Sequence, residues 1–177
     1  MPVLADTSVL NYLILLDQLA LLPTLYGRVI VPTVVLTVEL PHPDAPAPVR
    51  AWMAQLTVDP PWLERRAPTR QPEADLLLLE AGERDTILLA QESQAALVLM
   101  DDRDGRAAAE RRGLTVYGTV GVLVRAAERG LVDLQAMLTR LLTTNFRIEA
   151  RILQEALARD AARKAAAQGH PPAPQEP

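Results

Sequence analysis

Val3-Leu4-Ala5-Asp6-Thr7-Ser8, near the start of the chain, is the stretch that decides the fold. Residues 2–5 form a short apolar run, which is typical of a buried strand, and the polar triplet after them ends it. Apolar residues then recur at helical spacing, at Val9, Leu10 and Leu13. The pattern predicts a strand, a turn and a helix in direct succession.

The same alternation of strand and helix continues along the chain. Apolar runs predict further strands at residues 28–32, 95–100 and 114–117. Helical spacing predicts helices at residues 33–40, 49–57, from Gly82 onward, 104–112, 119–129 and 133–143. Strands that alternate with helices predict an α/β domain with a mostly parallel central sheet.

Two other parts of the chain are predicted to differ from this pattern. After residue 57, the prolines Pro60, Pro61, Pro68 and Pro72 predict an irregular segment. The length of residues 1–145 fits a single α/β domain, and residues 146–168 are assigned to a C-terminal helix, with helical spacing from about 147 to 167. The proline-rich residues 169–177 are predicted to form a disordered tail.

The composition excludes several kinds of chemistry. The chain has no cysteine, which excludes disulfides, thiolate metal sites and cysteine nucleophiles. Its two histidines, His42 and His170, both lie in proline-rich segments, and neither Ser8 nor Ser93 lies in a G-x-S-x-G motif. A metal ion in this protein would therefore be held by oxygen atoms.

Acidic residues follow the predicted strands at the points where those strands end. Asp6 follows the first strand, and Asp101 follows the strand at 95–100. Because ligands bind at the carboxyl ends of parallel strands, these two carboxylates are expected to converge if their strands are neighbours. Glu39, near the end of a predicted helix, and Glu83, at the start of another, are expected to join them.

Four carboxylates in one pocket repel one another and raise each other's pKa values unless a cation compensates them. Mg²⁺ or Mn²⁺ suits such oxygen ligands. An ion of this kind lowers the pKa of bound water and stabilises the charge that develops in an in-line displacement at phosphorus. The sequence therefore predicts phosphodiester hydrolysis, although Asp6 taken alone is more typical of a helix N-cap.

The motifs in this order resemble the PIN-domain proteins, and among them the VapC-like toxin ribonucleases, over about residues 3–145. The motifs that carry the resemblance are Val3-Leu4-Ala5-Asp6-Thr7-Ser8, Val31-Pro32 leading to Glu39, Gly82-Glu83 with Ile87 and Ala90, Met100-Asp101-Asp102-Arg103, and Gly118-Thr119-Val120-Gly121-Val122-Leu123. The resemblance implies a three-layer α/β/α sandwich, with C-terminal helices added here. It also implies cleavage of single-stranded RNA that depends on Mg²⁺ or Mn²⁺, and in many members an antitoxin partner.

The resemblance also assigns the site. It maps the family's first acid to Asp6, the helix acid to Glu39, and the third to Glu83, with Asp85 as an alternative. The late acid is Asp101, with Asp102 and Asp104 as alternatives, because the usual T-x-D motif is replaced here. Supporting hydroxyl groups are expected from Thr7, Ser8 and Thr119.

The remaining predictions concern partners and location. Arg103 and Arg106 follow the late acids and are the candidates for contacts with RNA phosphates. Beside RNA, an antitoxin protein and a second copy of the chain are possible partners. No apolar run is long enough to span a membrane, so a cytoplasmic protein is expected. The alternative function is a catalytically silent PIN-fold module that binds RNA or protein. A phosphorelay receiver is disfavoured because the sole lysine, Lys164, lies in the terminal helix.

Overall fold

A computed structural model describes residues 2–168 of the 177-residue chain. These residues fall into two compact units, the first ending at Val122 and the second beginning at Leu123. The tail predicted at residues 169–177 lies outside the described residues.

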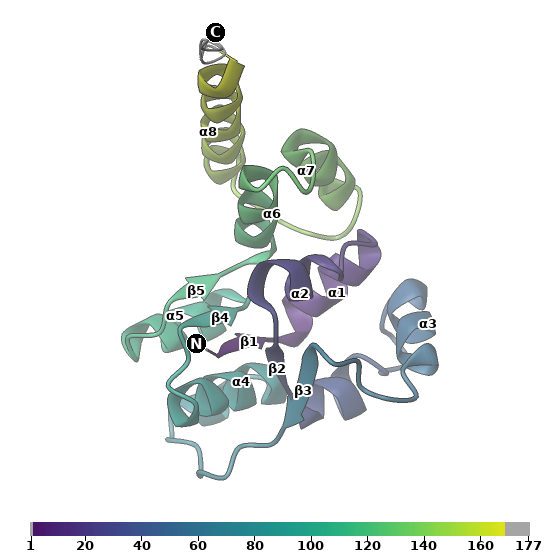
Figure 1. The fold of residues 1–177 in the computed structure, drawn as a ribbon. Helices are drawn as coiled ribbons and strands as arrows, with labels where there is room; N and C mark the ends of the chain where they lie inside the picture. Colours follow the sequence, from purple (N-terminus) through teal and green to yellow (C-terminus); the bar gives the residue numbers. More distant parts are fainter. Residues whose placement is uncertain (1, 169–177) are drawn as a thin grey trace, which may run out of the picture. The chain divides into compact units, whose positions relative to one another are not determined.

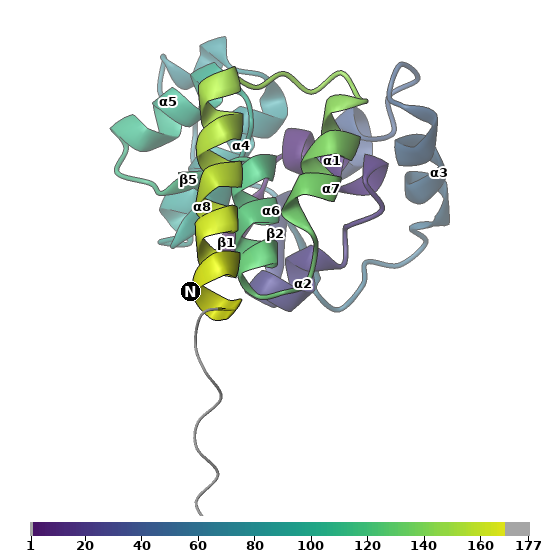
Figure 2. The ribbon, with the colours of Figure 1, turned by 90° about the horizontal axis from the view of Figure 1, so that it is seen from above.

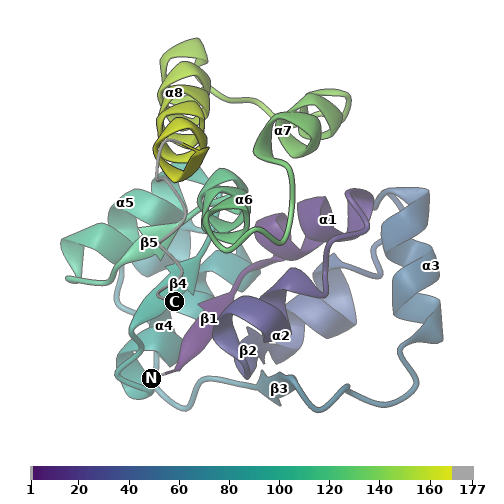
Figure 3. The ribbon, with the colours of Figure 1, turned by 45° about the horizontal axis from the view of Figure 1, so that its top comes forward.

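The first unit is built on a five-stranded sheet in which all neighbouring strands are parallel (Figure 1). The strands are β1 (Val3–Ala5), β2 (Val29–Pro32), β3 (Leu63–Arg66), β4 (Leu97–Leu99) and β5 (Val116–Tyr117). Their order is β3-β2-β1-β4-β5, so β1 lies at the centre between β2 and β4 (Figure 3). All three residues of β1 are buried, as the apolar run at residues 2–5 predicts.

Helices cover both faces of this sheet, which confirms the predicted α/β sandwich. They are α1 (Thr7–Leu15), α2 (Leu21–Tyr26), α3 (Ala47–Gln55), α4 (Ala81–Glu92), α5 (Arg103–Arg111) and the start of α6 (Thr119–Glu128), with a π-helix η1 (Val35–Glu39) and a 3₁₀ turn η2 (Leu76–Leu78). Figure 1 shows α1 and α2 on the opposite side of the sheet from α4. Helix α3 contacts α1 and lies at the margin of the unit (Figure 2).

The hydrophobic core on one face joins the sheet to α4 and α5. Leu4 and Val98, from the two central strands, pack with Ile87 of α4 and Ala109 of α5, and none of these four side chains is accessible to solvent. Burying a leucine or isoleucine side chain contributes about 1.5–3 kcal/mol, so this layer fixes where the strand ends lie.

The strand β3 lies in the segment predicted to be irregular, so that prediction was wrong. Only Leu63 of its four residues is buried, and the other three are charged. The strand forms because its backbone pairs with β2 at the edge of the sheet, and Arg65 binds Asp59 in an ion pair of 2.7 Å. Charged residues are common on edge strands, where they prevent pairing with other chains. Because such a strand lacks the apolar run by which strands are recognised, it could not be predicted from the sequence.

Three helices differ from their predictions, and the first two of them carry candidate site residues. The helix predicted at 33–40 contains a π-helical turn, in which the Leu40 amide donates to the Val35 carbonyl at 2.9 Å, and Glu39 is the last residue of that turn. Asp102, rather than Asp104, is the N-cap of α5. The terminal helix α8 runs over Ala150–Gln168, a little later than the predicted 147–167.

The second unit contains the rest of α6, α7 (Leu134–Leu142) and α8. Helix α7 begins at Asp133, whose side chain accepts a hydrogen bond from the Ala136 amide at 2.8 Å. Lys164 of α8 binds both Asp133 and Asp160 at 2.9 Å. These ion pairs join α7 to α8. None of the helices in residues 2–168 is both long and apolar enough to cross a lipid bilayer.

Candidate active site

Asp6 is a buried carboxylate at the carboxyl end of the central strand. Its side chain is the N-cap of α1, accepting hydrogen bonds from the Thr7 amide and, at 2.9 Å, from the Ser8 hydroxyl. Only 2% of Asp6 is exposed. Burial raises the pKa of Asp6 to about 7, the hydrogen bonds from Ser8 and Thr7 oppose this, and the negative charge of Glu39 adds to it. The cap explains the local geometry, and the raised pKa shows that burial disfavours the ionised carboxylate, which a nearby cation would stabilise.

Ser8 connects the ends of the two central strands. While its hydroxyl donates to Asp6, its oxygen accepts the backbone N–H of Asp101 at 3.0 Å. This contact is possible because β1 pairs in parallel with β4, and Asp101 lies two residues after β4 ends at Leu99. The structure therefore brings Asp6 and Asp101 together through one side chain, as parallel strand ends require.

Asp101 is held from its other side by the N-terminus of α6. The Thr119 amide donates to one carboxylate oxygen at 2.8 Å, and the Thr119 hydroxyl donates to the other at 2.6 Å. Burial raises the pKa of Asp101, whereas the Thr119 hydrogen bonds and the positive charge of Arg106 oppose that rise. A Cβ atom at Gly118 would lie 2.5 Å from the Asp101 carboxylate, so only glycine permits this approach.

Glu83 lies on the first turn of α4 and is coupled to the other acids. Burial raises its pKa to about 7, and the negative charges of Asp102 and Asp6 add to the rise, while a hydrogen bond with the backbone of Glu80 opposes it. The alternative residue at this helix, Asp85, instead forms an ion pair with Arg84 at 3.3 Å. Of these two candidates, Glu83 is therefore the one whose charge is coupled to Asp6.

The alternatives at the late acid lie in different surroundings. Asp102 uses one side-chain oxygen to cap α5, accepting the amides of Asp104 and Gly105 at 2.8 and 2.9 Å. Asp102 and Asp104 are both exposed, whereas Asp101 is less so and is held by Thr119. Asp101 is therefore the late carboxylate that the fold holds most firmly in place.

Glu39 bridges two segments that are far apart in the sequence. One carboxylate oxygen accepts the backbone N–H of Gly82 at 2.6 Å, and the other accepts the hydroxyl of Thr7. Thr7 follows Asp6, and Gly82 precedes Glu83. Both oxygens of Glu39 are thus turned to protein donors.

The four acids fit a divalent cation by chemistry and charge. All donors are oxygen atoms, and burial raises the pKa values of Asp6, Glu83 and Asp101, so a divalent cation beside them would favour their ionised forms. Within residues 2–168, however, no group of three or more acidic or histidine side chains is positioned to hold an ion as it stands. Asp6, Glu39 and Asp101 are each directed to hydrogen-bond donors of the protein instead.

Sequence reasoning did not assign three residues to this site, although two of them, Gly82 and Gly118, stand in the motifs quoted above. Gly82 and Gly118 matter because a Cβ atom at either would collide with Glu39 or Asp101, respectively. Tyr12 is a partly buried phenol whose pKa is raised by burial and by the negative charge of Asp101. Its position four residues after Ser8, on the same face of α1, is the signal that could have identified it.

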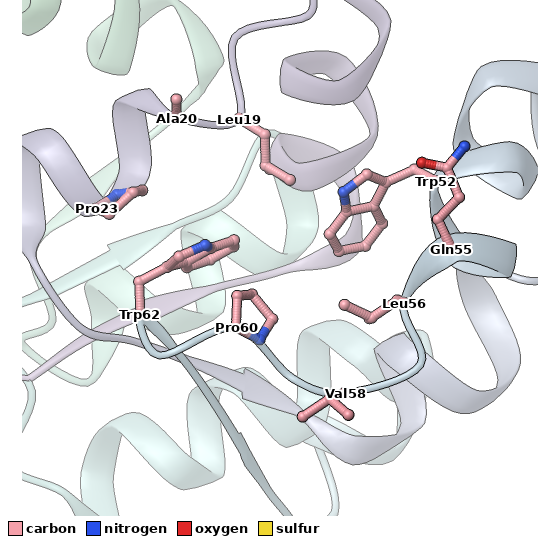
Figure 4. A pocket seen from close by; sticks show the side chains of 9 residues that line it. All are labelled: Leu19, Ala20, Pro23, Trp52, Gln55, Leu56, Val58, Pro60 and Trp62. Carbon is pink, nitrogen blue, oxygen red and sulfur yellow. The ribbon is translucent and has the colours of Figure 1, made fainter.

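A separate apolar cavity of about 430 Å³ lies elsewhere in the first unit (Figure 4). Both tryptophans of the chain, Trp52 and Trp62, contribute to it. The other residues that line it are Leu19, Ala20, Pro23, Gln55, Leu56, Val58 and Pro60. No acidic side chain lines this cavity, so it is distinct from the carboxylate site.

Replacing Thr119 with valine tests whether the orientation of Asp101 matters. The valine removes the 2.6 Å hydrogen bond from the hydroxyl but keeps the backbone amide and the side-chain shape. We expect affinity for Mn²⁺ to fall by about 10- to 100-fold, as for other partners that orient a metal-binding carboxylate. Titration with Mn²⁺ measures this. Thr24→Val is the matched control, since the Thr24 hydroxyl is exposed and donates to the Ala20 carbonyl at 2.8 Å. Equal affinities for the two variants would contradict the expectation.

A family model described as the PIN domain matches residues 2–161, which is most of the chain. No curated protein matches the chain closely. The parallel sheet and the acids at its strand ends agree with that match, and the chain therefore belongs to the PIN-domain family, whose fold is that of a nuclease.

Proposed function

We propose that this protein is a metal-dependent endoribonuclease that hydrolyses phosphodiester bonds of single-stranded RNA. The observation that supports this most is the convergence of Asp6 and Asp101 on Ser8 at the carboxyl ends of β1 and β4. Glu83 adds a third negative charge that acts on Asp6. In a PIN-domain protein, such a group of buried and partly buried acids is suited to bind a cation and a phosphate together.

Asp6, Glu83 and Asp101 are the residues that would hold Mg²⁺ or Mn²⁺. When bound, the ion supplies a Lewis acid that lowers the pKa of water and neutralises charge at the phosphate. Ser8 and Thr119 orient the carboxylates through their hydroxyl groups. Arg106 lies beside Asp101, with its guanidinium bonded to the Met100 carbonyl at 2.9 Å, and would bind a phosphate next to the acids.

We also propose that the protein is the toxin of a toxin-antitoxin pair and that it acts in the cytoplasm. The resemblance to VapC-like toxins supports a toxin paired with an antitoxin, and a homodimer is proposed as well. Arg103, which is exposed at the start of α5, is proposed to contact RNA together with Arg106. RNA as substrate agrees with a cytoplasmic protein.

Cleavage of end-labelled RNA tests the proposed function. We expect the full chain with Mn²⁺ to cut single-stranded RNA, to cut duplex RNA and single-stranded DNA much less, and to lose activity when EDTA removes the metal. Restoring Mn²⁺ should restore cleavage, which separates metal dependence from damage by the chelator. Cleavage that persists unchanged in EDTA, or no cleavage of any RNA, would contradict the proposal.

A catalytically silent binding module is the second candidate. The observation that favours it is the geometry of the acids, of which no three in residues 2–168 are positioned to hold an ion. A titration distinguishes the two candidates. Absence of Mn²⁺ binding up to millimolar concentration, together with binding of RNA without cleavage, would support the module and contradict the nuclease.

A further inference from the structure

We propose that Glu39 is a positioning residue that fixes Asp6 and Glu83 relative to each other, and that it is not a metal ligand. The Glu39 carboxylate, the Gly82 amide and the Thr7 hydroxyl form one set of hydrogen bonds, which we call the Glu39 brace. The assignment of ligands rests on the proposed metal-dependent function. The brace itself is visible without any metal.

The first argument is that α4 needs a cap that its own sequence does not supply. The N-cap residue of α4, Glu80, makes no side-chain cap hydrogen bond. The first amides of a helix have no partner within the helix, and a buried amide without a partner is unfavourable. Glu39 supplies the missing acceptor to the Gly82 amide at 2.6 Å, and its negative charge is favourable at a helix N-terminus.

The second argument is the close fit between Gly82 and Glu39. A Cβ atom placed on Gly82 would overlap the Glu39 carboxylate. Gly82 is buried and has no positive φ angle, so conformational freedom does not explain the glycine. The space left by the missing side chain is occupied by the Glu39 carboxylate.

The third argument is which residues the brace joins. Thr7 is the residue after Asp6 and begins α1, and Gly82 is the residue before Glu83 in the first turn of α4. By bonding to both, Glu39 links the start of α1, next to Asp6, to the start of α4, next to Glu83. Both Glu39 oxygens are engaged in this link, whereas Glu83 is close enough to Asp6 for their charges to interact.

Glu39→Gln and Glu39→Ala separate a positioning role from a ligand role. A glutamine keeps the brace, because its carbonyl oxygen accepts the Gly82 amide and its NH₂ group donates to the Thr7 oxygen. It is, however, a poorer ligand for Mn²⁺ than a carboxylate. We expect Glu39→Gln to bind Mn²⁺ within about fivefold of the parent, a margin for the charge lost at the helix terminus. We expect Glu39→Ala to bind about 10- to 100-fold more weakly.

Two further variants calibrate this titration. Glu83→Gln, which neutralises a proposed ligand, should lose more Mn²⁺ affinity than either Glu39 variant. Glu149→Gln, at an exposed position, is the matched control and should behave as the parent does. A Glu39→Gln variant that loses as much affinity as Glu83→Gln would make Glu39 a ligand and overturn the inference.

Hydrogen exchange of the Gly82 amide in metal-free protein tests the brace independently of the proposed function. We expect exchange about 10- to 100-fold faster in Glu39→Ala than in the parent, since a hydrogen bond to a charged group is lost, and near-parent exchange in Glu39→Gln. Thr7→Val removes one bond of the brace, so we expect exchange of the Gly82 amide to be accelerated less than in Glu39→Ala. If the parent binds no Mn²⁺, the proposed function fails, and the exchange result still decides the brace. Equal exchange in the parent and Glu39→Ala would overturn it.

Discussion

Asp6→Asn is expected to abolish RNA cleavage and, at the same time, to stabilise the metal-free protein at pH 8. The loss of a carboxylate that would hold the ion removes several kcal/mol of charge stabilisation in the transition state. Because each 1.36 kcal/mol changes a rate tenfold, we expect cleavage to fall by about 10³-fold. Single-turnover cleavage of labelled RNA measures this loss.

The gain in stability follows from the pKa of Asp6. Burial raises it from 3.8 to about 7, so at pH 8 the folded protein carries an ionised group that it disfavours. One pKa unit corresponds to about 1.4 kcal/mol, which gives an upper bound of about 4 kcal/mol, and we expect a gain of about 2 kcal/mol. Asparagine is as good an N-cap as aspartate, so α1 keeps its start. Urea unfolding at pH 8 measures the free energy.

Asp17→Asn is the matched control for both measurements. Asp17 is exposed and has a φ angle of 56°, a conformation that asparagine also tolerates. It should change neither cleavage nor stability. Cleavage by Asp6→Asn at the parent rate would refute the role of Asp6, and a loss of stability at pH 8 would refute its unfavourable ionisation.

Mn²⁺ is expected to raise the melting temperature by about 5–10 °C at pH 8 and by much less at pH 5. An ion at about 100 times its dissociation constant stabilises a protein by about 2.7 kcal/mol. For a chain of this size, 1 kcal/mol corresponds to about 2–4 °C. At pH 5, Asp6 and Glu83, with pKa values of about 7, hold protons that compete with the ion. Calorimetry with and without Mn²⁺ at the two pH values measures the difference.

Without metal, the stability itself should fall between pH 5 and pH 8. In this range the folded protein keeps protons on Asp6 and Glu83 that the unfolded chain, with pKa values of 3.8 and 4.5, has already released. The folded state therefore binds more protons, and raising the pH towards 8 removes that advantage. Groups such as Asp133 and Asp160, whose pKa values are lowered by Lys164 and by hydrogen bonds, act at lower pH and do not contribute here. Metal-free stability that rises from pH 5 to pH 8 would contradict the coupling of the acids.

The central strands of the sheet could be predicted because each is a short, continuous run of apolar residues. The runs at residues 2–5 and 95–100 became the paired strands β1 and β4, and Gly82 marked the start of α4 correctly to within one residue. The strand β3 could not be predicted, since Glu64, Arg65 and Arg66 show no apolar alternation and only pairing with β2 gives them a strand conformation.

The sequence by itself determined which acids are candidates, because Asp6 and Asp101 directly follow strands and parallel strands end at one edge. Only the tertiary structure decided how each acid is held. Ser8 links Asp6 to Asp101, Thr119 orients Asp101, and Glu39 is bonded to Gly82 over 43 residues. The physical reason is that strand and helix patterns are local, whereas a hydrogen bond between distant segments depends on where packing of the core places them.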